Sequence, residues 1–344
     1  MNEDGLKLTT YFGERDRVGG RFLADALLDV YERHELLMSV LLRGAEGFGA
    51  KQKLRTQRLL TLSEDESLVS VALDTRERIE RAAGEVSELC PAELVTLEEA
   101  RVLSRRVGPV ALGAEPEEAT KLTVYCGRHA RAAGRPAHVA VVDLLHRRGI
   151  AGATVLLGVD GTVQGTRQRA DFFGRNAEVP LLIVAVGSGE RIAPVLPELA
   201  ELLPNPVLTL EPVRVCKRDR RRLAEPRLLP AGEASGPPMS QKLTIYASEQ
   251  ARHAGRPAYL ELVRHLRAAG AEGATVLRGV WGYHGEHAPH GDRLLALRRR
   301  VPVVTSILDR PERMSRWFEL VDQLMTEGEL VTSEEVRSLR SKAF

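Results

Sequence analysis

Three segments of the chain begin with nearly the same residues, Leu8-Thr9-Thr10-Tyr11, Leu122-Thr123-Val124-Tyr125 and Leu243-Thr244-Ile245-Tyr246. A shift of 121 positions aligns the second segment with the third, without a gap, from residue 121 to residue 161. Roughly 22 of the 41 aligned positions are identical, far more than two unrelated segments would share. A shift of 114 brings the more diverged first segment into register through Gly20, Gly44 and Gly47. The sequence therefore predicts three copies of one unit of about 100 residues.

Within one copy, the hydrophobic pattern alternates between the strand period and the helix period. In the first copy it predicts strands at 7–12, 36–42, 68–73 and 94–97, with helices beginning near Leu23 and Ile79. This βαββαβ order is typical of a ferredoxin-like α+β domain. Because one such unit leaves a face of its sheet uncovered, we expect three tandem ferredoxin-like domains to pack around a pseudo-threefold axis, as a pseudo-trimer made by one monomeric chain.

The composition between the copies sets the expected domain boundaries. We expect repeat 1 at residues 5–105, repeat 2 at 120–216 and repeat 3 at 241–344. Residues 106–119 are rich in Gly, Pro, Ala and Glu, and residues 217–240 begin with a basic run and end in Gly and Pro. Both compositions predict exposed linkers.

Charge and cysteine content exclude several classes of protein. The 344 residues carry 49 Lys and Arg against 47 Asp and Glu, a net charge of +2, which argues against a nucleic-acid-binding protein. Three cysteines are too few for a disulfide framework. The polar N-terminus lacks the apolar core of a signal peptide, and no apolar run reaches the about 18 residues of a membrane span. We therefore expect a cytoplasmic protein.

A glycine pair recurs after the second predicted strand of each copy, and in the first copy it is followed by basic residues. Residues 43–55 contain three glycines, two lysines and two arginines. Glycine permits close approach of the backbone, and such a loop would suit a phosphate-bearing ligand. The sequence matches neither a P-loop nor a Rossmann fingerprint. A strand exit or β-bulge explains the same glycines equally well.

The run from Leu8-Thr9-Thr10-Tyr11 through residues 43–49 to residues 62–65 resembles the uncharacterised family called domain of unknown function 190. Copy three matches the same pattern, whereas copy two has Leu157 in place of the arginine. That family is similar in fold to the PII signal-transduction proteins, ferredoxin-like trimers whose clefts between subunits bind nucleotides or other small effectors. The long loop between their second and third strands contacts partner proteins, often transporters, and some family members are linked to fluoride-channel proteins.

The resemblance implies a PII-like sensor or regulator that is not an enzyme. Its small anionic effector, such as an adenine nucleotide, would bind in clefts between the repeats, and its partner would be a channel or transporter of the fluoride-channel type or another protein. Carried over by position, the effector-binding residues would be Arg43, Gly44, Gly47, Gly49, Lys51 and Lys53 in copy one and Arg278, Gly279 and Gly282 in copy three. Leu157 removes the corresponding charge from copy two, so we expect unequal clefts.

A cluster of histidines in copy three supports a different class of function. His284, His287 and His290 lie within a segment rich in Gly and Pro, and imidazole is a common ligand of zinc, copper and nickel. The alternative function is therefore a metal-binding or metal-tolerance module, as in the ferredoxin-like trimers of copper-tolerance proteins. A polar surface loop explains the same residues. We find no repeated nucleophile or acid–base pair, and we expect no catalytic residues.

Overall fold

We describe the fold from a computed structural model of the chain. The structure describes residues 2–49, 55–56, 66–104, 107, 110, 112, 118–168, 179–227, 239–284, 288–291 and 301–339. Each third of the chain contributes the same succession of long elements: a strand, a helix, two strands, a helix and a last strand. Short two-residue strands lie between them.

Repeat 1 begins with a strand whose apolar residues Leu6, Leu8 and Phe12 alternate with polar ones, the pattern of a strand with two different faces. Its first helix buries Leu23, Leu27 and Val30 on one side, as their spacing requires. The elements are β1 (Asn2–Gly13), β2 (Arg17–Val18), β3 (Arg21–Phe22), α1 (Leu23–Arg33), β4 (Met38–Phe48), β5 (Arg55–Thr56), β6 (Ser67–Thr75), α2 (Arg76–Leu89) and β7 (Leu94–Ser104).

Repeat 2 follows the same order, but its second helical segment is divided in two near Pro194, the residue that precedes α5. Proline has no backbone N–H and interrupts a helix ladder. The elements are β8 (Glu118–Gly127), β9 (Arg131–Ala132), β10 (Arg135–Pro136), α3 (Ala137–Arg147), β11 (Gly152–Val163), β12 (Thr166–Arg167), β13 (Pro180–Gly187), α4 (Gly189–Ile192), α5 (Val195–Leu202), β14 (Val207–Arg218) and β15 (Arg221–Arg222).

In repeat 3 the middle strand is divided at Gly279 into two strands. The elements are β16 (Met239–Ser248), β17 (Arg252–His253), β18 (Arg256–Pro257), α6 (Ala258–Ala268), β19 (Gly273–Arg278), β20 (Trp281–His284), β21 (His290–Gly291), β22 (Pro302–Asp309), α7 (Pro311–Leu324) and β23 (Leu330–Ser338). Lys217 and Arg218, the start of the basic run, belong to β14, and Lys217 is buried. The lysine ammonium group donates to Asp322 and to the carbonyl of Met325.

The strands of the three repeats join into one antiparallel sheet of 17 strands. Within repeat 1, β1 pairs with β6 and β7, and β6 pairs with β4. The outer edges then pair between repeats. Strand β4 pairs with β11 and β19, and β11 pairs with β20. At the other edge, β7, β14 and β23 pair with one another. The sheet therefore closes on itself.

The prediction of three ferredoxin-like βαββαβ domains packed as a pseudo-trimer is therefore wrong. No repeat keeps a sheet of its own, because mostly antiparallel strands run on from one repeat into the next and the few helices lie outside them. The physical reason is strand length. Strands β4 and β7 each have 11 residues, longer than the expected 36–42 and 94–97, and their ends supply hydrogen bonds to neighbouring repeats.

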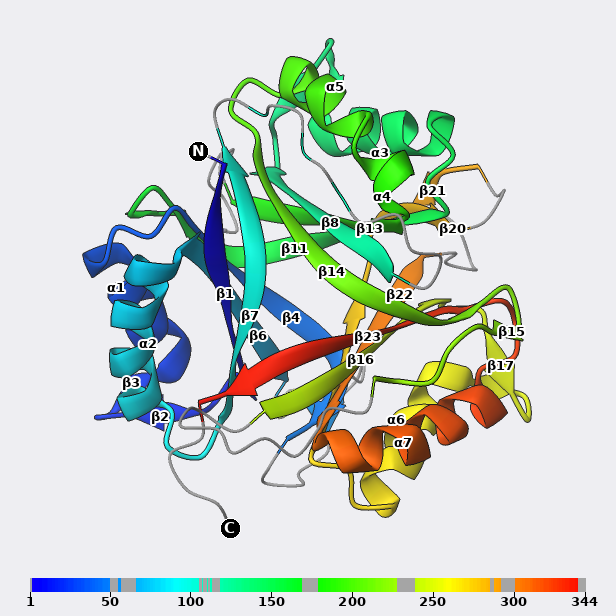
Figure 1. The fold of residues 1–344 in the computed structure, drawn as a ribbon. Helices are drawn as coiled ribbons and strands as arrows, with labels where there is room; N and C mark the ends of the chain where they lie inside the picture. Colours follow the sequence, from blue (N-terminus) through cyan, green and yellow to red (C-terminus); the bar gives the residue numbers. More distant parts are fainter. Residues whose placement is uncertain are drawn as a thin grey trace.

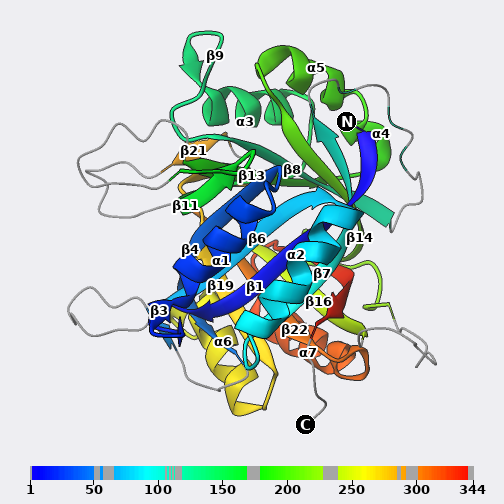
Figure 2. The ribbon, with the colours of Figure 1, turned by 90° about the vertical axis from the view of Figure 1, so that its left-hand side faces the viewer.

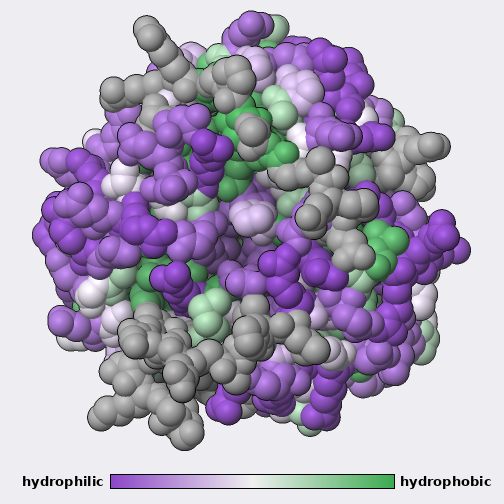
Figure 3. Space-filling view, in the orientation of Figure 1, coloured by the Kyte–Doolittle hydropathy of each residue, from purple (hydrophilic) through white to green (hydrophobic). Residues whose placement is uncertain are grey.

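Hydrophobic packing divides into outer clusters and one inner cluster. The helices of each repeat pack on the outer side of its strands; in Figure 1 they lie at the periphery, and in Figure 2 α1 and α2 lie in front of the strands. An inner cluster joins residues of repeats 1 and 2, including Val40, Val71, Tyr125 and Leu182, with Leu277 of repeat 3 packed against it. The face in Figure 3 is mostly hydrophilic, with hydrophobic residues visible in separate patches. Within the described ranges, no helix has the length and apolar character to cross a membrane.

Candidate functional site

The first strand of each repeat directs the same three polar positions to the interior of the closed sheet. In β1, Leu6 and Leu8 belong to the outer cluster, so the alternating residues Lys7, Thr9 and Tyr11 face inward. The equivalent residues of repeats 2 and 3 line the same central cavity: Lys121, Thr123, Tyr125, Lys242, Thr244 and Tyr246. The last strand of each repeat adds one glutamate, Glu98, Glu211 or Glu334.

These three lysines and three glutamates form a ring of ion pairs, which we call the central ring. Each lysine contacts the glutamate of its own repeat and that of one neighbour, and Lys121 also lies 3.9 Å from Glu98. Lys7 lies 2.7 Å from Glu98 and also contacts Glu211 of repeat 2. Lys121 lies 2.8 Å from Glu211 and contacts Glu334 of repeat 3. Lys242 lies 3.2 Å from Glu334 and 2.5 Å from Glu98 of repeat 1.

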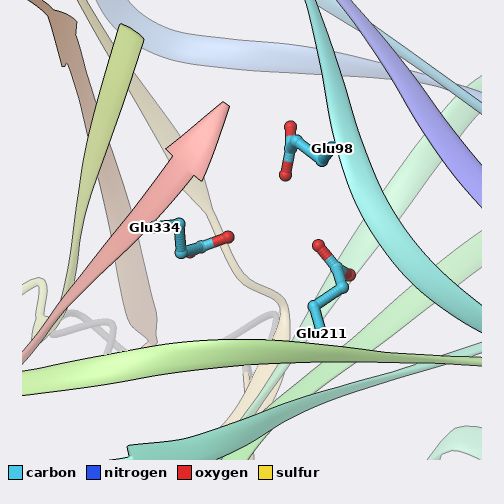
Figure 4. A group of neighbouring side chains, drawn as sticks. All are labelled: Glu98, Glu211 and Glu334. Atoms are coloured by element: carbon cyan, nitrogen blue, oxygen red, sulfur yellow. The ribbon is translucent and has the colours of Figure 1, made fainter. Parts of the chain in front are cut away.

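The carboxyl groups of the central ring converge on one point. Figure 4 shows the side chains of Glu98, Glu211 and Glu334 directed toward one another from three strands. One oxygen of each lies within 4.8 Å of the others. All six ring residues are at most 7% exposed. The other oxygen of each carboxylate accepts a hydrogen bond from a threonine at 3.2 Å, from Thr9, Thr209 and Thr244 in turn.

Mutual attraction keeps Lys7, Glu98 and Glu334 of the central ring ionised. Burial alone would lower the pKa of Lys7, but the carboxylates of Glu211 and Glu98 outweigh it and raise that pKa. Burial likewise opposes ionisation of Glu98, yet the ammonium groups of Lys242 and Lys7 hold its pKa well below the usual value. The pKa of Glu334 is lowered to about 2, because Lys121 and Lys242 outweigh the effect of burial. Lys7, Glu98 and Glu334 are therefore charged at neutral pH.

The recurring glycines lie where middle strands of different repeats approach most closely. A Cβ atom on Gly47 would come within 2.8 Å of the Ala274 carbonyl oxygen of repeat 3, and one on Gly161 within 2.3 Å of the Ser39 carbonyl oxygen of repeat 1. One on Gly282, whose φ is +154°, would come within 2.2 Å of the Ala153 carbonyl oxygen of repeat 2. Close strand contact thus accounts for these glycines.

The predicted glycines of copies one and three lie at two junctions of the closed sheet. Gly44 pairs with Leu277, the neighbour of Arg278, so residues 44–48 of repeat 1 lie against β19. Gly279 lies against Thr154 and Pro302, and with Gly282 it belongs to the junction with β11. Gly49 follows β4 and has open space around it.

Both predicted arginines have acidic partners. The guanidinium of Arg43 lies 2.7 Å from both Glu14 and Glu66. Arg278 lies 2.9 Å from Glu249 and donates to the Tyr259 hydroxyl at 3.3 Å. Lys51 and Lys53 are outside the described residues. An anion would therefore have to compete with glutamates for either guanidinium.

Two adjoining cavities form what we call the junction pocket, in repeat 3 next to its contact with repeat 2. The outer cavity, of about 470 Å³, is lined by Tyr246, Ser248, Gln250, His284, His290, Glu327 and Glu329, among others. The inner cavity, of about 80 Å³, reaches residues 151–154 of repeat 2 and shares Tyr246 and His284 with the outer one. Of the predicted histidines, His284 and His290 thus line one pocket, and His287 is outside the described residues.

Sequence reasoning did not find the central ring. Its signal was present, because the shifts of 114 and 121 that define the repeats also align Lys7, Lys121 and Lys242 directly before each repeated Leu-Thr-x-Tyr motif. A lysine at an inward strand position in all three copies needs buried acidic partners. The glutamates recur as well, two residues after a threonine in each final strand, but this pattern does not show which lysine each of them contacts.

The comparisons with known proteins identify the family. The model of the family DUF190, described as "Uncharacterized ACR, COG1993", matches residues 5–102, 119–215 and 240–338. The chain therefore belongs to this family and contains three tandem copies of its domain.

Two further matches have been found. A "UPF0166 protein" of Aquifex aeolicus (strain VF5) is 36% identical over 77 residues, covering 22% of this chain and 73% of that protein. A solved structure titled "Crystal structure study of anthrone oxidase-like protein" covers 71% of this chain and 98% of its own at 12% identity, with a TM-score of 0.19. At that score the structural likeness carries no argument.

Proposed function

We propose that this protein is a non-catalytic regulator of the PII-like kind, which binds a small anionic effector in the junction pocket. The observation that carries the proposal is the pocket itself. Its outer cavity of about 470 Å³ has the size of small-molecule sites, and its inner cavity reaches a second repeat. A ligand there contacts the elements that hold two repeats together and can alter their arrangement.

The turn at residues 248–250 of the pocket wall is a reason to expect that the effector carries an anionic group. Ser248 and Gln250 line the pocket, and Glu249 between them holds Arg278 at 2.9 Å. A phosphate or carboxylate bound at this turn would compete with Glu249 for the guanidinium, which forms strong paired hydrogen bonds with such groups. An adenine nucleotide is the first effector to test, because its phosphates supply the charge and its base can occupy an apolar cavity.

The state of the buried ionisable groups supports a role without catalysis. A general acid or base works best with a pKa near the working pH. Glu98 and Glu334 have lowered pKa values and Lys7 and Lys121 have raised ones, so all four are held in the charged form. These shifts suit a stable ionic ring and oppose proton transfer at neutral pH.

Signalling would occur through the segments that follow β4 and β11 and connect β20 with β22, with a channel, a transporter or another protein as the partner. We place this activity in the cytoplasm. Cys90, Cys126 and Cys216 form no disulfide, which supports that choice, because secreted proteins usually oxidise their cysteines in pairs.

Calorimetry with adenine nucleotides and cyclic dinucleotides tests the proposal on the full chain. We expect one of them to bind, and we expect Arg278→Ala to weaken binding about tenfold or more, the loss typical of a charge-assisted contact. Arg43→Ala is the matched control, because Arg43 pairs with Glu14 and Glu66 of repeat 1, whereas Arg278 pairs with Glu249, which lies between two residues that line the pocket. Equal losses in the two variants, or no binding of any of these nucleotides, would contradict the proposal.

One observation favours a second candidate, a metal-responsive regulator. His284 and His290 line the same cavity as Glu327 and Glu329, and nitrogen and carboxylate ligands suit zinc or copper. Titration with Zn²⁺ and Cu²⁺ distinguishes the candidates. A metal regulator requires heat of binding in the wild type and its loss in His284→Gln, while Arg278→Ala would leave metal binding unchanged.

A further inference from the structure

The central ring contains more hydrogen-bond donors than its own acceptors use. Each lysine ammonium group has three N–H bonds. Two are directed to carboxylates, as the ring contacts of Lys7, Lys121 and Lys242 require, and the third carboxylate near Lys121, that of Glu98, lies at 3.9 Å, beyond hydrogen-bond distance. On the carboxylate side, one oxygen is shared between two ammonium groups and the other accepts from a threonine. One N–H of each lysine is left over among the described residues.

A further donor lies on the same side of the ring. Tyr125 is 1% exposed, lines the central cavity, and its hydroxyl has no hydrogen-bond partner among the described residues. Thr209 is close enough to influence its pKa, but the threonine hydroxyl donates to Glu211. A buried hydroxyl without a partner is costly, so it indicates a group that is bound there in solution.

The central cavity next to these donors has a volume of about 90 Å³. All three ring lysines line it, whereas Glu98 is the one ring glutamate that does. The remaining wall combines leucines and valines of each repeat with hydroxyl side chains, among them Thr123, Thr275 and Ser306. Water in this cavity would need acceptors for its own hydrogens. A ligand that only accepts hydrogen bonds matches the surplus donors better.

We propose that the central cavity binds one small monovalent anion, of the size of chloride or formate, held by the three lysine ammonium groups and the Tyr125 hydroxyl. This site is distinct from the junction pocket and does not depend on the function proposed above. Tyr246 lines both spaces, so the anion can enter beside this side chain.

A cation at the converging carboxylates is the competing occupant, and the contacts oppose it. The three glutamate oxygens that approach one another within 4.8 Å are already shared between two ammonium groups each. Three neighbouring positive charges repel a metal ion, and no carboxylate has its coordinating oxygen available.

Crystals of the full chain soaked in sodium bromide provide the direct test. Bromide is an acceptor of suitable size whose anomalous scattering locates it. We expect an anomalous peak in the central cavity within contact of Lys7, Lys121 and Lys242. In solution, chloride or bromide should raise the melting temperature in a saturable way, beyond the effect of gluconate, an anion too large for the cavity, at equal ionic strength.

Two Tyr→Phe variants separate the site from general salt effects. Tyr125→Phe removes the cavity donor and should weaken halide affinity about tenfold. Tyr31→Phe is the matched control, since Tyr31 is equally buried but lies in the outer cluster of repeat 1. No peak in the cavity, equal stabilisation by halide and gluconate, or equal affinity in both variants would overturn the proposal. A peak at soaking concentration without halide-specific stabilisation would also overturn it.

Discussion

Lys242 in the first strand of repeat 3 lies 2.5 Å from Glu98 in the last strand of repeat 1, although 144 positions separate them in the chain. This contact closes the central ring, because the other two contacts between repeats that are shorter than 3.5 Å run from repeat 1 to repeat 2 and from repeat 2 to repeat 3. The ion pairs therefore follow the same cyclic order as the strand pairing. We infer that they specify how the repeats fit together.

Replacing Glu98 should destabilise the whole chain. Glu98→Gln keeps the shape of the side chain but leaves the ammonium groups of Lys7 and Lys242 with less compensation in a buried site. Removing one partner of a buried ion pair costs about 3–5 kcal/mol. Denaturant unfolding followed by circular dichroism should show this loss in the free energy of unfolding.

The neighbouring residue provides a matched control. Glu99 pairs with Arg76 and Arg337, but its side chain is 51% exposed. Exposed ion pairs contribute about 0–1 kcal/mol, so Glu99→Gln should change the free energy of unfolding by no more than that. A similar loss in both variants would show that the central ring has no special part in stability.

Acid should unfold the protein through the central ring. A lowered pKa in the folded state stabilises the fold above the pKa of the unfolded chain, and this stabilisation is lost as pH falls toward the folded value. For Glu334 that window extends from about 4.5 down to about 2, a contribution on the order of 3 kcal/mol. Melting temperatures should therefore fall steadily below about pH 5. A constant melting temperature from pH 5 to pH 3 would contradict this prediction.

The repeat structure could be predicted from the sequence because identical residues recur at fixed shifts. The alternation of Lys7, Thr9 and Tyr11 with Leu6 and Leu8 also predicts that β1 has one polar and one apolar face. The pattern does not indicate which strand of another repeat pairs with an edge strand. Hydrophobic periodicity does not reveal that β4 pairs with β6 of its own repeat as far as Arg43 and with β19 of repeat 3 from Gly44 onward.

The candidate site was predicted less completely for the same reason. The glycine pairs and His284 were identifiable as unusual residues, but the strand contacts that require Gly47 and Gly161 join different repeats. The glutamate partners of Arg43 and Arg278 likewise depend on side-chain positions that no local pattern records.

Arg167 should stabilise the junction between repeats 1 and 2. Its guanidinium lies 2.8 Å from Asp160, a buried residue of β11, and 2.6 Å from Asp25 in α1 of repeat 1. The pKa of Arg167 is raised, chiefly by its hydrogen bond to Asp160. Hydrogen bonds to charged groups contribute about 1.5–3 kcal/mol.

We therefore expect Arg167→Gln to lower the free energy of unfolding by about 1–3 kcal/mol. Arg135→Gln is the control, because Arg135 pairs with Asp143 inside repeat 2 and its side chain is 53% exposed. The pair within the repeat should contribute at most about 1 kcal/mol. If Arg135→Gln proved the more destabilising variant, the ion pairs across the junction would not be what holds these repeats together.

Two glycines permit a test in which one substitution to alanine should lower the melting temperature and the other should raise it. Gly161 lies in β11, where an added Cβ would come within 2.3 Å of the Ser39 carbonyl oxygen and 3.2 Å of Pro180. The oxygen belongs to the backbone of the paired strand β4, so relief requires the two repeats to separate. Such overpacking costs about 1–3 kcal/mol or more, and Gly161→Ala should lower the melting temperature accordingly.

Gly84, in the helix α2, has open space around its Cβ position. Alanine favours a helix over glycine by about 0.5–1 kcal/mol, so Gly84→Ala should raise the melting temperature. Hydrogen exchange should further show that Gly161→Ala weakens protection at Val40 and Leu41 of β4, which face it across the junction, more than in the outer helices. If Gly161→Ala were as stable as the wild type, the close approach of β4 and β11 would not be the reason for this glycine.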